Sequence, residues 1–431
     1  MPPLPPSETV SHINHALNNP TLAMDVICAT SLPTVWVGHE QALQDLLAEL
    51  IHVSMVALDT EFIKRDTYYP ILALLQINTG KRIYLIDALK FDDLMPLWQA
   101  LMACPLMIWH ACGEDLAIFY LLADCPVLTN VFDTQIALGF LTQQLKMGYQ
   151  KAISTELGVD IDKGESQSNW LHRPLSDAQI NYATDDVRYL LPLFAVICRQ
   201  LNDKGLIDMV IEDCQLYAQE VYDAQNMDDD LLYLSAADYR YDGVQLAFLQ
   251  SLLVWREELA RQTNQPRPFI IRKQGIAELV ELLPSTHKQL YRQTSLHRHI
   301  IEQYGSEIIK LVHTAKQLPA SEYPAPTIPP YRSKDKTLKN QLNSILQDYH
   351  TKTGIPTTIL LKKKWLTELL ELVALEIIDD GTGMTGNEVS QLPLGLQGWR
   401  LSLVTNHILP VLFSHKAHIQ EAMGLQHPKH A

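Results

Sequence analysis

Asp59 and Glu61 stand at the end of an apolar run that reads VALDTEF from Val56 to Phe62. In a β-strand, residues two apart point to the same face, so the two carboxylates would lie about 7 Å apart beside a hydrophobic interior. Burial and like charge both oppose ionisation of the pair, whereas a bound cation would favour it. The pair therefore predicts a metal site, provided that the chain supplies further oxygen ligands.

Two later segments supply candidate ligands. Asp115, in WHACGEDLAIF, is expected in the first turn of a helix that follows a strand, a position that the helix dipole alone would also favour. Tyr182 and Asp186, in NYATDDVRYLL, lie four residues apart on one helix face, where they would otherwise be a half-buried aromatic and a solvated charge. Asp133, in VFDTQIA, is interpreted as a helix N-cap.

The elements expected around these residues alternate between strands and helices. Strands are predicted over 54–62 and 105–111, with a hairpin over 71–89 that turns at Asn78-Thr79-Gly80-Lys81. A helix is predicted over 113–125, and a short strand leads into a helix over 130–141. This order predicts an α/β fold with a mixed sheet and helices on both faces.

Strand patterns disappear after about residue 235. A long amphipathic helix, a proline-containing turn and short helices follow, and then a linker with five prolines in LPASEYPAPTIPPYRS. Beyond the linker the design returns, with LLKKKWLTELLELV in place of IIRKQGIAELVELL. The second half is therefore interpreted as an imperfect repeat of a helical unit of roughly 80 residues.

Charge is unevenly distributed along the 431 residues, a length that predicts two to four domains. Residues 1–239 hold 12 Lys and Arg against 32 Asp and Glu, a net charge of −20. Residues 240–431 hold 22 against 17, a net charge of +5, and the two values sum to −15. This asymmetry is typical of a chain in which one half holds metal ions and the other meets a polyanion, although acidic surfaces also serve solubility.

Several protein classes are disfavoured by composition. No apolar run reaches the ~18 to 20 residues of a membrane helix, and MPPLPPSETV lacks the features of a signal peptide, so a cytoplasmic location is expected. The six cysteines form no C-x-x-C pair, which disfavours a zinc site and a disulfide framework.

Taken in order, the acidic motifs resemble those of the DEDD superfamily of 3′–5′ exonucleases. Asp59 and Glu61 match the first motif, Asp115 the second, and Tyr182 with Asp186 the third, in the branch with tyrosine. The histidine branch would need histidine where Asn181 stands. DTEFIKRDTYYPILALLQI and DKGESQSNWLHRPLSDAQINYATDDVRYLLPL further resemble the ribonuclease D family, and the helical half resembles paired HRDC domains.

The resemblance implies a ribonuclease H-like exonuclease domain and two all-α HRDC-like domains. It divides the chain into an N-terminal extension (1–31), the exonuclease domain (32–230), a first HRDC domain (238–318), a Pro-rich linker (319–334), a second HRDC-like domain (335–415) and a tail (416–431). A chain cut after about residue 235 is expected to keep metal-dependent nuclease activity and to lose its hold on structured RNA.

The resemblance also implies two divalent cations, Mg²⁺ or Mn²⁺. Asp59 would bridge both ions, Glu61 and Asp186 would complete the site of the ion that activates water, and Asp115 would hold the other. Tyr182 would orient the attacking water. These assignments match the preference of hard cations for carboxylate oxygens.

The implied reaction is removal of 5′-mononucleotides from the 3′ end of RNA, with tRNA precursors as the expected substrates. Lys163, Trp170 and Arg173 are candidate RNA contacts, and for Trp170 loop packing is an equal alternative. Basic residues of the helical half are expected to hold phosphates, with a solvated charged face as the alternative; they are Arg256, Arg261, Arg267, Arg272, Lys273, Lys362, Lys363 and Lys364. Neither a membrane nor an obligatory protein partner is expected.

Three other functions fit the residues less well. A DNA 3′–5′ exonuclease of the same superfamily would use the same five motif residues. A non-catalytic RNA-binding platform would not need all five. A haloacid-type phosphatase would require Asp-x-Asp at the strand end, where this chain has Asp59 and Glu61.

Overall fold

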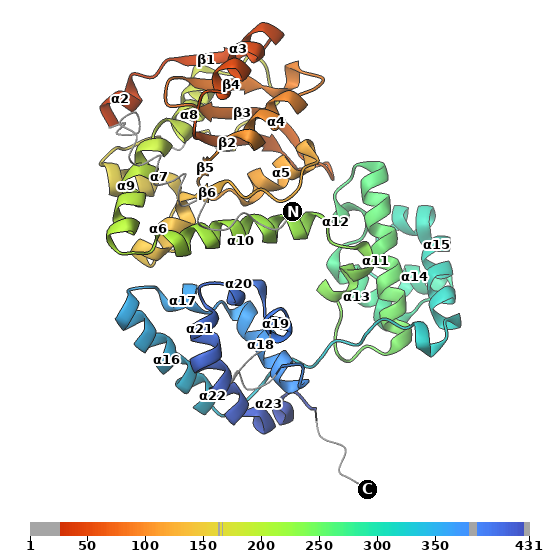
Figure 1. Ribbon diagram of the computed structural model, residues 1–431. Coiled ribbons are helices and arrows are strands. Elements are labelled where there is room, and N and C mark those ends of the chain that lie inside the picture. The colour runs from red at the N-terminus through yellow and green to blue at the C-terminus, as the bar shows by residue number, and fades with distance from the viewer. Residues whose placement is uncertain (1–25, 163, 166, 379–385, 426–431) are drawn as a thin grey trace. The chain divides into compact units, whose positions relative to one another are not determined.

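The protein divides into two compact units in a computed structural model that describes residues 26–162, 164–165, 167–378 and 386–425 (Figure 1). The first unit holds the described residues up to Ile63, Leu72–Gln225 and those from Tyr331 onward. The second unit holds Asn226–Pro330 together with the short segment Lys64–Ile71.

A six-stranded mixed sheet forms the centre of the first unit, with the strand order β1-β4-β3-β2-β5-β6. Strands β1 and β4 pair in parallel, as do β2 with β5 and β5 with β6, whereas β3 and β4 are antiparallel. The strand bounds are Thr34–Val37 (β1), Val56–Ile63 (β2), Ile71–Asn78 (β3), Ile83–Asp87 (β4), Met107–Trp109 (β5) and Val131–Asp133 (β6). The predicted fold class is confirmed.

The predicted hairpin is the β3–β4 pair, in which Asn78 lies opposite Ile83. Gly80 has a positive φ of 81°, a conformation that glycine adopts without steric cost, and its N–H donates to the Asn78 side chain. The Asn78 amide also donates to the carbonyl of Val187, 2.9 Å away. The turn is therefore tied to the C-terminal end of helix α8.

Helices cover both faces of the sheet (Figure 1). On β4, Tyr84 and Ile86 belong to the core that packs against α3 and α4, whereas Ile83 and Leu85 pack with α8, as the strand period of two requires. The helix bounds in this domain are Val26–Thr30 (α2), Glu40–Leu50 (α3), Met95–Ala103 (α4), Gly113–Ala123 (α5), Thr134–Thr142 (α6), Tyr149–Leu157 (α7), Asp177–Arg188 (α8), Leu190–Asp203 (α9) and Ile207–Gln225 (α10).

The second unit is a helical domain whose longest helix, α11, begins with a capping box between Asp242 and Gln245. Its core is built from buried aliphatic residues of α11, α13 and α15. The helix bounds are Gly243–Thr263 (α11), Arg267–Ile270 (α12), Lys273–Leu282 (α13), His287–Gln293 (α14) and Arg298–Gln317 (α15).

The helices after the linker repeat the order of α11, α12 and α13. In both places a long helix ends at a left-handed residue, Asn264 or Gly354, and a proline, Pro266 or Pro356, caps a one-turn helix that precedes a longer one. This agrees with the predicted internal repeat. The bounds are Thr337–Thr353 (α16), Thr357–Leu360 (α17), Lys363–Ala374 (α18), Gly386–Val389 (α19), Leu394–Gln397 (α20), Leu401–Leu403 (α21), Leu409–Ser414 (α22) and Lys416–Ala422 (α23).

Two predicted boundaries need correction. Ala29, in the predicted N-terminal extension, is fully buried with Ile153 and Tyr189, so the exonuclease domain begins before residue 32. Ile419 and Met423, in the predicted tail, are also buried, so the last helical domain continues beyond residue 415. Among the described residues, the helices lack the combination of length and apolar character that a bilayer span requires.

Candidate active site

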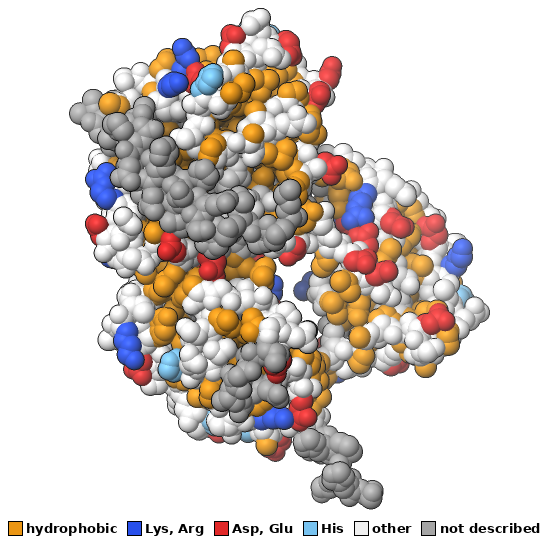
Figure 2. Space-filling model, in the orientation of Figure 1, with side chains coloured by type: hydrophobic (Ala, Val, Ile, Leu, Met, Phe, Trp, Pro, Cys, Tyr) orange, Lys and Arg blue, Asp and Glu red, His pale blue; other side chains and the backbone are white. Residues whose placement is uncertain are grey.

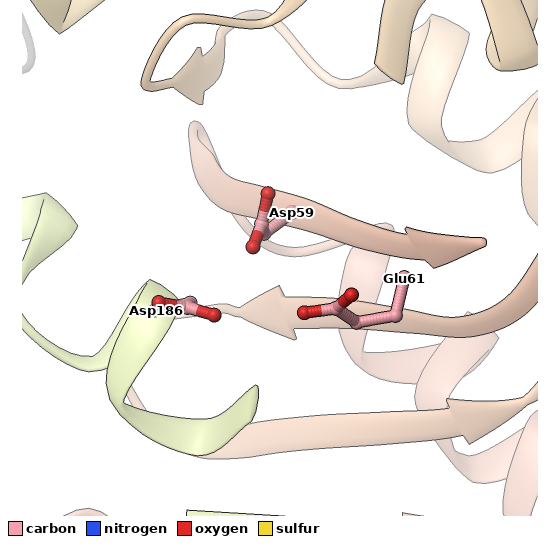
Figure 3. A group of neighbouring side chains, drawn as sticks. All are labelled: Asp59, Glu61 and Asp186. Atoms are coloured by element: carbon pink, nitrogen blue, oxygen red, sulfur yellow. The ribbon is translucent and has the colours of Figure 1, made fainter. Parts of the chain in front are cut away.

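Three of the carboxylates that are predicted to bind metal converge at one point. Asp59 and Glu61 reach from β2, and Asp186 reaches from α8 toward the same space (Figure 3). Each residue offers one carboxylate oxygen, and these three oxygens lie within 4.8 Å of one another. Asp59 and Glu61 lie two residues apart and therefore share one face of β2, and α8 lies over the sheet. This arrangement brings the three carboxylates together.

Asp115 lies beside this group and is held by Thr60, the residue between Asp59 and Glu61 on β2. The Thr60 hydroxyl donates a short hydrogen bond to the Asp115 carboxylate, and both side chains are buried. Asp115 is in the first turn of α5, as predicted. The structure thus gathers three acids closely and places the fourth within reach of their charges.

The turn that precedes α5 is held by a buried carboxylate from β6. Asp133 accepts hydrogen bonds from the backbone N–H groups of Ala111 and Cys112 at 3.0 and 2.9 Å, and Ala111 has a left-handed φ of 62°. Asp133 also caps α6 by accepting from Gln135 N–H, which agrees with its predicted N-cap role. One carboxylate therefore fixes both the start of α6 and the turn that delivers Asp115.

Tyr182 lies one helical turn before Asp186 on α8, as predicted. Its ring packs against that of Trp170, with the two ring centroids 6.1 Å apart. Helix α8 starts at a capping box between Ser176 and Gln179. Near its other end, the Tyr149 hydroxyl donates to the carbonyl of Asp185 at 3.1 Å. The helix that carries the third motif is thus held at both ends.

A pocket of about 180 Å³ opens onto the carboxylates. It is lined by Leu58, Asp59, His110, Tyr149, Tyr182, Asp186 and Leu190. His110 forms hydrogen bonds through both ring nitrogens, to Thr134 Oγ1 and to the Met147 carbonyl, each at 2.9 Å. Burial lowers the pKa of His110, so this ring is neutral at pH 7.

The pKa values of the clustered acids are all raised. Burial and the neighbouring Asp186 raise the pKa of Glu61 to about 9, and burial with the charge of Asp185 raises that of Asp186 to about 7. Burial and the surrounding acids also raise the pKa of Asp59. Burial raises the pKa of Asp115 as well, because this effect outweighs that of the hydrogen bond from Thr60, which lowers the pKa. A bound cation offsets the repulsion between these carboxylates and stabilises their ionised forms. The clustered acids therefore fit a divalent metal site.

Tyr182 differs chemically from the acids around it. Burial and the negative charge of Asp186 raise its pKa above the ordinary value of a phenol. The hydroxyl therefore stays protonated and can donate a hydrogen bond, but it cannot accept a proton at pH 7.

The candidate RNA contacts do not reach the site as predicted. Trp170 is 1% exposed, so it presents no free face to a base, and the packing alternative agrees with the structure. The Arg173 guanidinium is occupied by the buried Asp87 carboxylate at 2.7 and 2.9 Å and by the carbonyls of Ala73 and Trp170. These contacts correct the predicted RNA roles of both residues, because they stabilise the segment behind Tyr182. Lys163 lies outside the described residues.

Three arginines predicted to hold phosphates are engaged within the first helical domain. Arg261 and Arg267 form ion pairs with Asp229 and Glu257, and the half-buried Arg256 donates to the Ile271 carbonyl. Arg272 and Lys273 remain exposed at the start of α13. On the face drawn in Figure 2, acidic side chains lie among the basic ones of this domain, so that face carries no uniform positive charge.

Sequence reasoning missed Thr60, His110 and Tyr149 as members of the site. Thr60 stands between the two acids of the first motif, and alternation along a strand would point it away from them. His110 and Tyr149 lie in segments whose packing against β2 and α8 depends on the whole sheet. Local sequence patterns carry no signal for such long-range contacts.

Comparisons with known proteins agree with this arrangement. A family model described as 3′-5′ exonuclease matches residues 34–202, and an HRDC domain model matches residues 245–312. Ribonuclease D of Pseudomonas paraeruginosa is 31% identical over 382 residues, which are 88% of this chain and 97% of that protein. Ribonuclease D of Escherichia coli is 30% identical over 339 residues, 77% of this chain and 88% of that protein.

A solved structure shares the architecture over most of its length. The crystal structure of Escherichia coli RNase D, described as an exoribonuclease involved in structured RNA processing, superposes with a TM-score of 0.79 at 26% identity. The match covers 89% of this chain and 99% of that one.

Proposed function

Because this chain belongs to the ribonuclease D family of 3′–5′ exoribonucleases, we propose that Asp59, Glu61, Asp115 and Asp186 bind two divalent metal ions for RNA hydrolysis. The observation that carries the proposal is the convergence of three carboxylate oxygens within 4.8 Å from β2 and α8. Asp115, bonded to Thr60 on the same strand, supplies the fourth carboxylate. Four acids from three elements are what two hard cations need.

The metal ions would be Mg²⁺ or Mn²⁺, since the ligands are all carboxylates. When bound, such ions neutralise charge on the phosphoryl group and stabilise the attacking and leaving oxygens. The protein contributes the fixed positions of the acids: β2 holds two of them, and the turn bonded to Asp133 holds Asp115.

Tyr182 would orient the attacking water by donating a hydrogen bond. Its raised pKa keeps the proton on the phenol, and packing against the buried Trp170 limits movement of the ring. The adjoining pocket, with the rings of His110 and Tyr149 in its wall, would receive the 3′-terminal residue of the RNA. The roles of water orientation and substrate placement therefore fall on neighbouring side chains.

We infer that the substrates are structured RNAs with short 3′ extensions, such as tRNA precursors. Support comes from the relative in Escherichia coli, which is described as acting in structured RNA processing, and from the HRDC domain. Exposed Arg272 and Lys273 in that domain are suited to phosphate contacts. A role in 3′-end trimming follows from an exonuclease that holds a folded RNA body.

The test is hydrolysis of 5′-labelled RNA and of DNA of the same sequence, with Mg²⁺, with Mn²⁺ and with chelator. We expect stepwise shortening of RNA from the 3′ end, release of 5′-mononucleotides and reversible silencing by chelator. Asp59→Asn, which removes a ligand charge without changing volume, should abolish the reaction while leaving thermal unfolding of the metal-free protein near wild type. Preferential hydrolysis of DNA, or a chelator-resistant activity, would contradict the proposal.

A further inference from the structure

The connection between the catalytic strand and the next strand belongs to the helical domain. Strand β2, which carries Asp59 and Glu61, ends at Ile63, and the residues Lys64–Ile71 then pack as part of the unit that contains Asn226–Pro330. Tyr68 lies seven residues after Glu61 in the sequence. A short stretch of chain therefore connects the first motif to contacts made inside the helical domain.

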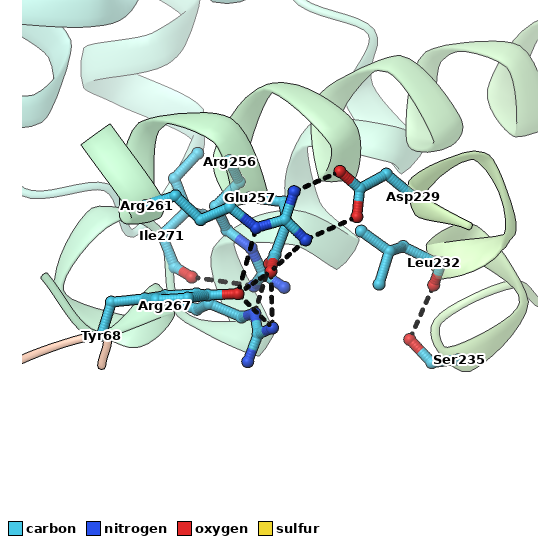
Figure 4. Close-up of polar contacts among 9 residues, drawn as sticks. All are labelled: Tyr68, Asp229, Leu232, Ser235, Arg256, Glu257, Arg261, Arg267 and Ile271. Carbon is cyan, nitrogen blue, oxygen red and sulfur yellow. Dashed lines mark hydrogen bonds and ion pairs between the residues drawn. The ribbon is translucent and has the colours of Figure 1, made fainter. Parts of the chain in front are cut away.

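Tyr68 is held by both its backbone and its side chain. Figure 4 shows the contacts of the side chain. The backbone N–H groups of Tyr68 and Tyr69 each donate to the Asn264 side-chain oxygen at 3.1 Å. Asn264 is the left-handed residue that ends α11, with a φ of 48°. The Tyr68 hydroxyl donates a short hydrogen bond to the Glu257 carboxylate of the same helix.

Glu257 is only 1% exposed and is the centre of this group of contacts. Arg267 donates two hydrogen bonds to its carboxylate, and the Arg267 guanidinium also lies 5.0 Å from the centre of the Tyr68 ring. Arg261 approaches the same carboxylate at 3.3 Å and pairs with Asp229 at 2.5 and 2.8 Å. Removal of one donor from this buried carboxylate should be strongly destabilising, because part of the carboxylate charge would be left uncompensated.

Both partners keep the protonation states that the contact needs. Burial alone would raise the pKa of Glu257, but the hydrogen bonds from Arg267 and Tyr68 outweigh it and hold that pKa below its usual range. Burial and the hydrogen bond to Glu257 raise the pKa of Tyr68. A phenol donor therefore faces an ionised acceptor throughout the physiological pH range.

We propose that Tyr68 and Glu257 are positioning residues that fasten the first helical domain to the β2–β3 connection, so that RNA held by this domain is presented to the carboxylates of β2. The inference rests on the proposed function, since it concerns how the bound RNA reaches that site. The helical domain is thereby attached at a third place, besides the chain connections near residues 226 and 330. Additional attachment raises the effective concentration of held RNA at the site without any new RNA contact.

Tyr68→Phe is the direct test in the full-length protein, because it removes the hydroxyl and keeps the ring. Tyr69→Phe is the matched control, since it removes a hydroxyl from a side chain that is 38% exposed and keeps both the backbone N–H and the ring that packs against the Tyr68 ring. The substrates are a hairpin RNA with a short 3′ tail and an unstructured oligomer of the tail sequence. Michaelis constants and turnover numbers are measured for both.

We expect Tyr68→Phe to raise KM for the hairpin about tenfold, as loss of a hydrogen bond to a charged group allows, with kcat unchanged. Kinetics on the oligomer, and both substrates with Tyr69→Phe, should match wild type. An equal loss on hairpin and oligomer would overturn the proposal, because the segment would then act on β2 itself. Unchanged kinetics on the hairpin would overturn it as well.

Hydrogen exchange in RNA-free protein supplies a readout that does not depend on activity. Exchange of the Tyr68 and Tyr69 amides should accelerate in Tyr68→Phe and in Glu257→Gln, and the double variant should add little to either one, because both changes remove the same contact. Slow exchange that persists in both variants would overturn the fastening role. Failure of the wild type to hydrolyse any RNA would instead refute the proposed function, and the exchange result would still decide whether the contact fastens the domain.

Discussion

Arg400 and Asp213 lie 187 residues apart in the sequence and form a buried bidentate ion pair, with both nitrogen–oxygen distances at 2.6 Å. The guanidinium is stacked on the rings of Trp399 and Trp365, at 4.0 and 4.8 Å from their centres. Trp399 also donates from its backbone N–H to Glu212 and from its indole to Asp213. The second helical domain is thus joined to helix α10 of the exonuclease domain through buried polar contacts.

Replacing Arg400 by Met should destabilise this joined unit, because the Asp213 carboxylate would stay buried without its cationic partner and keep only the hydrogen bond from the Trp399 indole. Breaking one side of a buried ion pair lowers the free energy of unfolding by about 3–5 kcal/mol. Denaturant unfolding of the first unit measures the effect, and Arg332→Met, at an exposed arginine just before α16, is the control. A loss below about 1 kcal/mol would mean that water reaches Asp213 and that the pair contributes as little as a surface one.

This pair also revises the expectation for a chain cut after about residue 235. Such a cut removes Arg400 and leaves Asp213 on α10 uncovered, together with the Glu212 carboxylate that approaches Gly398 closely. A Cβ on Gly398 would meet Glu212 Oε1 at 1.5 Å, which shows how tightly the two surfaces fit. Loss of activity in the cut protein would therefore reflect lost stability as well as lost RNA contacts, and point substitutions separate the two effects better.

Tyr182→Phe should slow hydrolysis about a hundredfold without weakening metal binding, since misplacing a reacting group by about 1 Å has an effect of that size. The phenol is a donor with a raised pKa, so its removal takes away water orientation and not a ligand. Single-turnover rates and Mn²⁺ titration by calorimetry measure the two properties separately. Weaker Mn²⁺ binding in the variant would show that the hydroxyl instead positions Asp186.

Asp133→Asn should reduce activity by disturbing the turn that delivers Asp115. The carboxylate uses one oxygen for Ala111 N–H and the other for Cys112 N–H, so an amide would turn a donor toward a donor at one of them. We expect kcat to fall at least tenfold at temperatures well below unfolding, with KM nearly unchanged. Asp124→Asn, at the exposed far end of α5, is the control. A lowered melting temperature with normal kcat would limit Asp133 to a structural role.

The parts of the site that follow from local geometry were predictable. Asp59 and Glu61 share a face because a strand has period two, and Tyr182 and Asp186 share one because a helix brings residues four apart together. The mixed sheet followed from the order of apolar runs. Each of these inferences uses only residues within one or two elements.

The parts that depend on contacts between distant elements were not predictable. Trp170 and Arg173 have side chains suited to RNA, yet the sheet buries the first and Asp87 binds the second. Arg261 and Arg267 likewise carry positive charge that the sequence cannot show to be paired with Asp229 and Glu257. Residue type indicates what a side chain can bind, and only the packed fold determines which partner is nearest.

The raised pKa values of the acids predict how stability depends on pH and metal. In the folded protein the pKa of Glu61 is about 9 and that of Asp186 is about 7, whereas the ordinary values are 4.5 for glutamate and 3.8 for aspartate. The folded state therefore keeps protons that the unfolded state has released, so the stabilising effect of these protons is complete below pH 4 and is lost as pH rises through 7 to 9. Without metal, the melting temperature should fall between pH 6 and 8.5, on the order of 5 °C.

Added Mn²⁺ should remove that fall, because the cation favours the ionised carboxylates, and its binding near pH 7 should release protons. Melting curves with and without Mn²⁺ at several pH values test the first point, and calorimetry in buffers of different ionisation enthalpy tests the second. Glu61→Gln is the matched variant: it lacks the carboxyl group whose pKa is raised to about 9, so its metal-free melting temperature should depend less on pH. If the metal-free wild type became more stable between pH 6 and 8.5, the acids would be ionised without a cation, and the cluster would not have the electrostatic character that a metal site requires.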